Sequence, residues 1–162
     1  MLGYVYGHDV EVARFVARLI PHFHGREFDE HARALGIIDG EGKLIAGVVY
    51  HNYDPEAALI EISGAALPGK YWITPETLRR AYQYPFLGLR CQMVVQRTPS
   101  DNEYLLEILA KLNYAFIRFP RMMGRDRDGT ICYLTYEAWC DGKICRRYKH
   151  HIADQRLAEA AE

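Results

Sequence analysis

The sequence lacks the features that mark membrane-spanning, secreted and nucleic-acid-coating proteins. No apolar run among its 162 residues approaches the roughly 18 residues of a membrane span. The N-terminus carries no basic segment followed by a long apolar core, so no secretion signal is evident. The formal net charge is only -1, so no global field attracts nucleic acid. These absences predict a cytoplasmic protein without a membrane segment.

Cysteine is scarce, and its spacing is not that of a disulfide framework. The cysteines are Cys91, Cys132, Cys140 and Cys145. We expect reduced thiols. Cys140 and Cys145 are followed by His150 and His151, which together offer four zinc-type ligands, but the spacing is not that of a zinc finger. The sequence therefore predicts no metal site, with free cysteines and a solvated tail favoured over zinc.

The composition is that of an ordinary globular protein with 49% hydrophobic and 25% charged residues. This length suits a single domain, and we place it at residues 1–140. Residues 141–162 form a tail that is first basic and then rich in alanine and glutamate. Twelve tyrosines favour clefts and interfaces, where a ring is half buried.

The first half of the chain reads as a strand, a helix and three hairpin strands. Val12, Phe15, Val16, Leu19 and Ile20 recur at helical spacing, Asp9 is expected to cap that helix, and Pro21 ends it. Short turns separate three alternating apolar segments, which must pair as antiparallel neighbours. The expected strands are Leu2–Tyr6, Ala32–Ile38, Leu44–Tyr53 and Ala58–Ala66.

The second half alternates helices and strands. Thr74 is a plausible N-cap with Pro75 at the first helical position, and that helix is expected to end before Pro85. Asp101 or Asn102 caps a second apolar helix. The expected strands are Leu89–Arg97, Ala115–Met122 and Thr130–Trp139, with a loop over Gly124–Gly129.

This order of elements predicts an α/β (α+β mixed) fold. A run of antiparallel strands precedes a β-α-β unit, whose right-handed crossover makes one strand parallel to another in the sheet. We therefore expect a mixed, mostly antiparallel central sheet of about seven strands with helices on both faces.

Five segments resemble the GCN5-related N-acetyltransferase (GNAT) superfamily, in the branch common in phages and prophages. The resemblance covers most of the chain, from Leu44 to Trp139. The segments are Trp72-Ile-Thr-Pro75, Tyr84-Pro-Phe86, Cys91–Gln96, Asn102–Leu112 and Glu137-Ala-Trp139.

The resemblance implies an acyl-CoA cosubstrate such as acetyl-CoA in a V-shaped opening between the strands Ala58–Ala66 and Leu89–Arg97. The pyrophosphate would bind at the backbone amides before the helix at Thr74, where free N–H groups suit a phosphate. The implied cofactor-binding residues are Ala65, Leu67, Gly69, Lys70, Thr74 and Asn102.

The chain departs from the family at two places. The family's Gln/Arg-x-x-Gly-x-Gly/Ala loop is reduced to Gly69, and Pro75 has no N–H to donate. Leu109 stands where the family often has the tyrosine that protonates the departing thiolate.

Glu61 is the best candidate for the catalytic base. It lies between Ile60 and Ile62, so it faces opposite to them, and the family often has an acidic base on this strand. A solvent-facing carboxylate is the alternative. His51 and Tyr53 share one strand face by period two and are candidates to line the acceptor pocket, with simple exposure of His51 as the alternative.

Three functions remain open. The first is N-acetyl transfer to an unknown amine by direct attack on acetyl-CoA. The second is modification of a nucleobase in phage DNA, supported by a basic tail and by the arginines Arg118, Arg121, Arg125 and Arg127. The third is a non-catalytic phage protein that keeps the fold, and a homodimer is one assembly that any of them allows.

Overall fold

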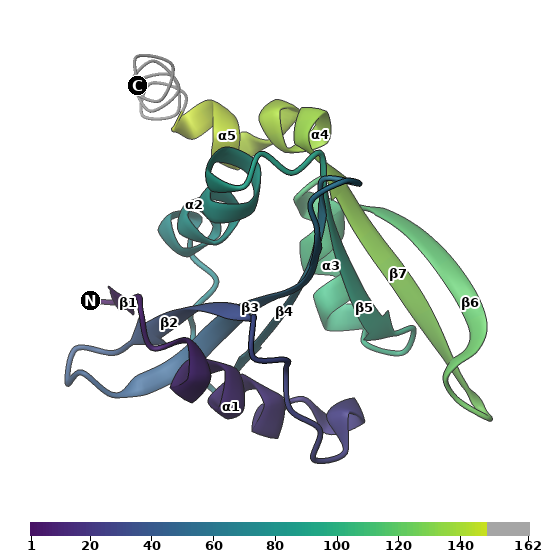
Figure 1. The fold of residues 1–162 in the computed structure, drawn as a ribbon, viewed down its shortest axis with the longest axis horizontal. Helices are drawn as coiled ribbons and strands as arrows, with labels where there is room; N and C mark the ends of the chain where they lie inside the picture. The colour runs from purple at the N-terminus through teal and green to yellow at the C-terminus, as the bar shows by residue number, and fades with distance from the viewer. Residues whose placement is uncertain (149–162) are drawn as a thin grey trace. The chain divides into compact units, whose positions relative to one another are not determined.

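The computed structural model describes residues 1–148, which form two compact units, Met1–Thr77 and the chain from Leu78 onward (Figure 1). Most of the tail lies outside the described residues, including His150 and His151, for which zinc binding was not favoured. The strands and helices of each unit are described by themselves.

The first unit is an antiparallel sheet with one helix across it. The register runs β1 to β2, β2 to β3 and β3 to β4, as the short turns predicted. Helix α1 packs against β2, β3 and β4 (Figure 1). The elements are β1 (Gly3–Val5), α1 (Asp9–Leu19), the 3-10 turn η1 (Pro21–Phe23), β2 (Arg33–Ile38), β3 (Leu44–Asp54) and β4 (Leu59–Ala66).

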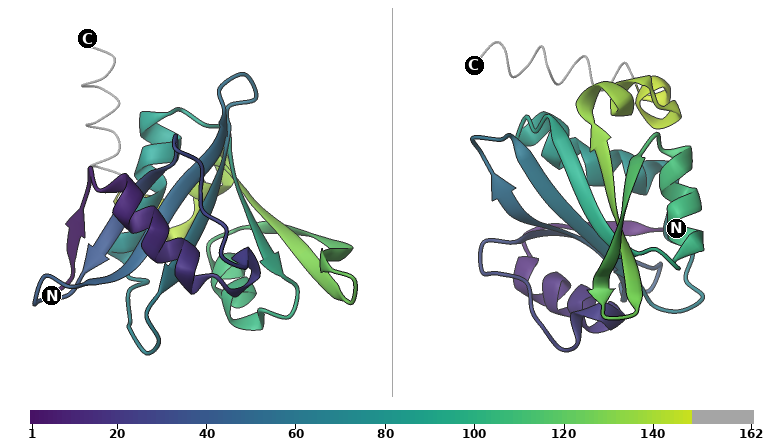
Figure 2. Two further views of the ribbon diagram at one scale, coloured as in Figure 1. Left: turned by 60° about the horizontal axis from the view of Figure 1, so that its bottom comes forward. Right: turned by 90° about the vertical axis from the view of Figure 1, so that its right-hand side faces the viewer.

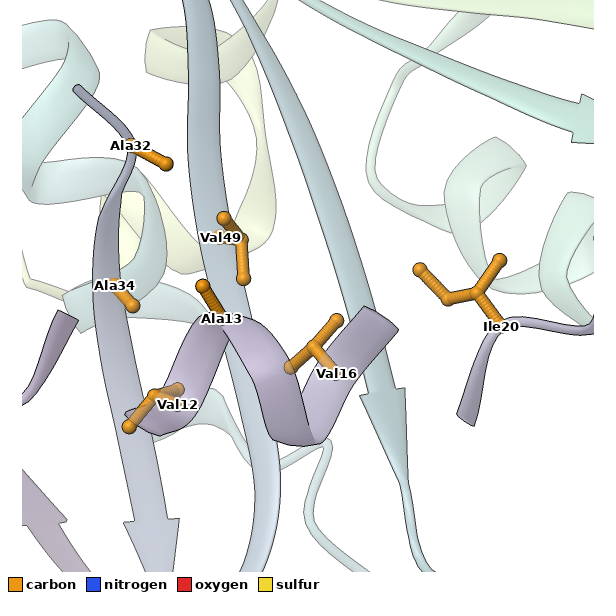
Figure 3. Packing of buried hydrophobic residues seen from close by; sticks show 7 residues of the cluster. All are labelled: Val12, Ala13, Val16, Ile20, Ala32, Ala34 and Val49. Carbon is orange, nitrogen blue, oxygen red and sulfur yellow. The ribbon is translucent and has the colours of Figure 1, made fainter. Parts of the chain in front are cut away.

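The core of this unit lies between α1 and the sheet. A close view shows small and branched side chains of α1 directed at β2 and β3 (Figure 3). Gly47 of β3 lets the helix come close, because a Cβ there would lie 2.7 Å from a methyl carbon of Val12 and 2.7 Å from one of Val16. The buried cluster comprises Val12, Ala13, Val16, Ile20, Ala32, Ala34 and Val49.

The expectation that Asp9 caps α1 is wrong. Asp9 is the first helical residue, and His8 holds the cap position without a side-chain hydrogen bond. The Asp9 carboxylate instead accepts the backbone N–H of Ala34 on β2 at 2.7 Å. A contact distant in sequence thus replaces the local cap.

Helix α2 (Pro75–Gln83) begins where the sequence predicted. Thr74 Oγ1 accepts the backbone N–H of Thr77 at 3.1 Å, which is the N-cap bond. The Thr77 hydroxyl lies 2.9 Å from the hydroxyls of both Thr74 and Tyr4, so the cap is tied to β1.

The second unit contains a three-stranded antiparallel sheet in the order β5, β7, β6. Since β7 is antiparallel to both neighbours, β5 and β6 run in the same direction and α3 connects them. The β6–β7 hairpin extends as a long twisted ribbon (Figure 2). The elements are the wide helical turn η2 (Tyr84–Gly88), β5 (Met93–Pro99), α3 (Glu103–Lys111), β6 (Ala115–Gly124), β7 (Arg127–Thr135), α4 (Tyr136–Asp141) and α5 (Lys143–Arg147).

Two buried tyrosines cross-link this unit. The hydroxyls of Tyr82 and Tyr114 lie 2.7 Å apart, and Gln96 Nε2 donates to Tyr114 Oη at 2.8 Å. Burial disfavours the phenolate and raises the pKa of both tyrosines. Nearby, the rings of Phe86 and Trp139 stack with centroids 5.2 Å apart.

The strand expected from Leu89 begins later, at Met93. The helical path does not stop at Pro85 but widens, with Leu89 N–H donating to Tyr84 O and Cys91 N–H donating to Pro85 O. Arg90 follows with a φ of 56°, in the left-handed region. Because these N–H groups bond within the wide turn, the residues that the apolar pattern assigned to the start of a strand do not pair with a neighbouring strand.

Two further boundaries differ from expectation. The last strand ends at Thr135, because the Thr135 hydroxyl accepts the N–H of Ala138 and starts α4, which contains Trp139. The loop expected over Gly124–Gly129 is a tight hairpin, with Gly124 paired with Arg127. The fold class is confirmed as mixed α/β with seven mostly antiparallel strands in residues 1–148. None of the helices there is long and apolar enough to span a bilayer.

Candidate active site

Four side chains of β3 and β4 form a square on the sheet face that α1 covers. The register pairs Val49 with Ser63 and His51 with Glu61. Directly opposed residues project from the same face, and Val49 belongs to the core under α1. Glu61 and His51 therefore lie on the face of the α1 layer.

His51 is buried, with 7% of its surface exposed. Its Nε2 lies 2.9 Å from Ser63 Oγ, and its ring lies 4.8 Å from the ring of Phe28 between centroids. The ring of Phe23 in turn lies 4.8 Å from that of Phe28 between centroids. The alternative that His51 is simply exposed is therefore wrong.

The pairing of His51 with Tyr53 on one face is also wrong. The β3–β4 register shifts between His51 and Asp54, and Asn52 adopts a left-handed φ of 50°. An extra residue in one strand breaks the period of two. Tyr53 is 43% exposed, whereas His51 is buried.

The same irregularity brings Asn52 to the candidate base. Asn52 Nδ2 donates to Glu61 Oε2 at 2.9 Å. This bond orients the carboxylate, which is partly buried at the centre of β4. A half-buried, oriented carboxylate beside a histidine suits proton transfer better than a freely solvated one.

The expected phosphate-binding segment follows β4 and is tied to the first hairpin. Leu67 N–H donates to Ile45 O at 2.8 Å, and Lys70 N–H donates to Leu67 O at 3.2 Å. Lys70 Nζ lies 3.9 Å from Asp39 Oδ2. The N–H of Lys43, with the charge of Lys70 as a smaller contribution, holds the pKa of Asp39 below its usual value.

Backbone donors remain available ahead of α2. In the part of the chain that the structure describes, the N–H groups of Tyr71, Trp72 and Ile73 have no acceptor. Gly69 has a φ of 73° and open space around its Cβ position. Three N–H donors, an open glycine and the Lys70 ammonium fit a phosphate group.

Thr74 and Asn102 are occupied as helix caps. Thr74 holds α2, and Asn102 Oδ1 accepts Leu105 N–H at 3.3 Å at the start of α3. Asn102 belongs to the second unit, whereas the five other expected cofactor residues belong to the first. Ala65 packs against the core under α1. The roles of these residues stay predictions.

Two of the cavities lined by described residues, each within one unit, are large enough to hold a small ligand. One of about 250 Å³ lies between α1 and the segment before β2; its lining includes Phe28 and the carboxylates of Asp9, Glu27, Asp29 and Glu30. One of about 410 Å³ in the second unit is lined by Phe86, Leu87, Arg90, Cys91, Gln92, Tyr136 and Glu137. None of the site residues expected from the sequence lines either cavity.

Two of the four arginines that suggested a nucleic-acid surface are in ion pairs. Arg118 donates to Asp128 at 2.9 Å and Arg127 donates to Asp101 at 2.9 Å. The Arg121 N–H and the Arg118 guanidinium hold the pKa of Asp128 below its usual value. These pairs neutralise part of the basic surface.

No protein-family model and no curated protein matches the chain, but solved structures do. A spermidine/spermine N-acetyltransferase from Vibrio cholerae superposes with a TM-score of 0.69 at 14% identity, covering 87% of this chain and 98% of its own. The chain has the fold of the N-acetyltransferases. An acetyltransferase from T. thermophilus, with an unproven assignment, has a TM-score of 0.61 at 18% identity, covering 76% of this chain and 68% of its own. A dodecameric spermidine N-acetyltransferase from Vibrio cholerae has a TM-score of 0.67 at 13% identity, covering 85% and 95%.

Reading the sequence missed three residues of the site. Ser63 follows Glu61 by two positions, so the period of the strand could have placed it on the same face. Asn52 carried no signal, because the irregularity that turns it toward Glu61 is a tertiary feature. Phe28 lies in a segment without periodicity, and only the folded chain brings it to His51.

Proposed function

We propose that this chain is an acyl-CoA-dependent N-acetyltransferase that acts on a small primary amine. The observation that carries the proposal is the oriented Glu61 carboxylate opposite His51, on the strand that leads into an N-acetyltransferase-type strand-to-helix junction. Direct attack of an amine on a thioester needs a base at the amine and donors at the phosphates, and both are on this strand or just after it.

Acetyl-CoA would be held by the segment after β4. The Tyr71, Trp72 and Ile73 amides and the Lys70 ammonium would bind its phosphates, Gly69 would allow close approach, and Ala65 and Leu67 would contact the pantetheine arm. Asn102 is proposed as a further cofactor contact. The cosubstrate supplies the activated acetyl group, and Glu61 accepts a proton from the ammonium form of the acceptor.

The proposed acceptor of the acetyl group is a positively charged amine and not a nucleic acid. The cavity beside Phe28, which contacts His51, is lined by four acidic residues and by Arg14. Arg14 pairs with Glu27 and Arg33 with Asp9, so the negative charge near this face comes from Asp29 and Glu30. A polyamine is attracted to such a surface and a DNA phosphate backbone is repelled. Tyr53, exposed at the end of β3, is proposed to contact the distal part of the acceptor.

The test is acetyl-CoA binding by calorimetry, followed by thiol release with spermidine, putrescine and amino acids as acceptors. Glu61→Gln should retain acetyl-CoA binding and lose about 10²-fold or more in kcat. Glu56→Gln, on the turn of the same hairpin, is the matched control and should behave as wild type. Absence of binding at millimolar acetyl-CoA would leave a protein that keeps the fold without the activity. Salt-sensitive DNA binding with transfer to a nucleobase would favour the phage-type alternative.

A further inference from the structure

A serine and a histidine form a second polar pair on the face that carries Glu61. Ser63 Oγ lies 2.9 Å from His51 Nε2. Ser63 follows Glu61 by two residues on β4, which separates the two Cα atoms by roughly 7 Å along the strand. Glu61 and Ser63 thus project from the same face of β4, one strand period apart.

The contacts of His51 hold its ring in one orientation. Phe28 packs on the ring at 4.8 Å, and Phe23 supports Phe28 at the same centroid distance. Val49, buried next to His51 on the same face, fixes the strand beneath it. A ring held in this way keeps Nε2 at Ser63, and because a hydroxyl can donate or accept, this hydrogen bond is compatible with either neutral tautomer of the ring.

A serine hydroxyl is a weak base and a weak acid by itself, but a hydrogen-bonded histidine can accept its proton. With the ring proton on Nδ1, Nε2 accepts the hydroxyl proton, and the serine oxygen can take up another. The pair therefore offers a path for a proton between a ligand at Ser63 and the buried imidazole of His51.

Acetyl transfer requires two protons to leave the acceptor nitrogen. An ammonium and an acetyl thioester give an amide, a free thiol and one proton; the C–N bond forms and the C–S bond breaks. One proton leaves the ammonium before attack, and the second leaves the nitrogen of the tetrahedral adduct. One of the two ends on the departing sulfur, and the other ends in solvent.

We infer that Ser63 and His51 carry the second proton while Glu61 takes the first. Ser63 Oγ accepts the proton of the adduct nitrogen as its own hydroxyl proton moves to His51 Nε2. The imidazolium then returns that proton through Ser63 to the departing thiolate, which leaves His51 neutral. His51 acts only through Ser63. This inference rests on the proposed acetyltransferase function.

Charges of both signs act on the transient imidazolium. Glu61 lies directly across from His51 on the paired strand. Glu27, Asp29 and Glu30 flank Phe28 on the segment that covers the ring, and Arg14 of α1 is paired with Glu27 at 3.5 Å. Arg14 and Arg33 offset Glu27 and Asp9, which leaves Glu61, Asp29 and Glu30 to favour the cationic ring. The burial of His51 and the guanidinium of Arg26 over the Phe23 ring oppose it.

The kinetic test compares Ser63→Ala, Ser63→Thr and His51→Gln with the wild type, using acetyl-CoA and spermidine or the best acceptor found. We expect Ser63→Ala and His51→Gln to lose about 10²-fold in kcat with little change in KM for acetyl-CoA. Ser63→Thr keeps the hydroxyl and should keep most of the activity. Ser100→Ala and His31→Gln are control substitutions of the same kinds, at residues bonded to Thr130 and Glu30. Retention of kcat in Ser63→Ala would overturn the inference.

The pH dependence separates proton transfer from simple packing. The wild-type kcat should rise with pH as the ring of His51 loses its proton, because only a neutral ring accepts the serine proton. Ser63→Ala should lose that rise. An unchanged profile with a uniformly lower kcat would mean that Ser63 only supports the fold.

A measurement without substrate keeps the inference testable if no acceptor is found. Long-range ¹H–¹⁵N NMR of the whole protein reports which nitrogen of His51 carries the proton, with His51→Gln assigning the signal. We expect Nδ1–H and an unprotonated Nε2. A proton on Nε2 in the neutral ring would overturn the relay, whereas failure of acetyl-CoA to bind would overturn the proposed function instead.

Discussion

Replacement of Gly47 by alanine tests how α1 is seated on the sheet. The new methyl would lie 2.7 Å from Val12 Cγ1 and 2.7 Å from Val16 Cγ2, about 0.7 Å inside the closest ordinary contact. Both valines are fully buried, so neither can move into solvent. The helix must lift or the valines must leave their rotamers.

The expected cost follows from two opposed contributions. Overpacking of a filled core costs about 1–3 kcal/mol, and alanine recovers about 0.5–1 kcal/mol because it loses less backbone entropy than glycine. We expect Gly47→Ala to lower the free energy of unfolding by about 1–2 kcal/mol. For a chain of this length the melting temperature should fall by about 2–8 °C.

Urea denaturation followed by far-ultraviolet circular dichroism measures this change. Gly40→Ala is the matched control, because the atoms nearest its Cβ position are 3.9 Å away. Val16→Ala removes one of the crowding methyls, so the two substitutions combined should destabilise by less than the sum of their separate effects. If Gly47→Ala is as stable as Gly40→Ala, the close contact between α1 and β3 at Gly47 is wrong.

Three other predictions follow from the caps, the buried phenols and the phosphate segment. Thr74→Val should cost about 0.5–2 kcal/mol of stability by urea denaturation, and Thr74→Ser should cost little, unless the cap bond is absent in solution. Because the pKa of Tyr82 and Tyr114 is raised, stability is retained below the ordinary tyrosine value near 10 and falls as the pH rises above it. Absorbance titration should then show two phenols that ionise only on unfolding, and ionisation in the native state would contradict this. Lys70→Ala should weaken acetyl-CoA binding severalfold in calorimetry, more at low salt than at high salt, whereas Lys43→Ala should not; equal effects would count against a phosphate role for Lys70.

Local signals predicted most of the secondary structure. The strands Arg33–Ile38, Leu44–Asp54 and Leu59–Ala66 lie within two residues of their expected bounds, because alternation and turn residues act over a few positions. The starts of α2 and α3 were predicted for the same reason. Thr74 and Asn102 accept backbone N–H groups three residues away, and a contact this local can be predicted from the sequence.

The boundaries that differed depend on contacts between distant residues. Phe86 stacks on Trp139 although 53 positions separate them, and that packing accompanies the wide turn that delays β5. The apolar residues around Leu89 are compatible with a strand, but their backbone bonds go to Tyr84 and Pro85. Hydrophobic periodicity is measured over neighbouring positions, so it cannot detect a contact with a residue far along the chain.

In the candidate site, too, some features follow from local sequence and others depend on contacts between distant residues. The sequence placed Glu61 and His51 on neighbouring strands, because turn residues and alternation are local properties, but the register that sets them opposite each other came only from the structure. It gave no sign that His51 is buried against Phe28 or that Asn52 turns onto Glu61.

By itself, the sequence determined the order of strands and helices, the antiparallel hairpins and the strand that carries the candidate base, since these depend on near neighbours and turn chemistry. Only the tertiary structure decided which polar groups meet. Burial and side-chain hydrogen bonds depend on segments that packing brings together from far along the chain. The Ser63–His51 pair, the Tyr82–Tyr114 pair and the bond of Asp9 to β2 all belong to that second class.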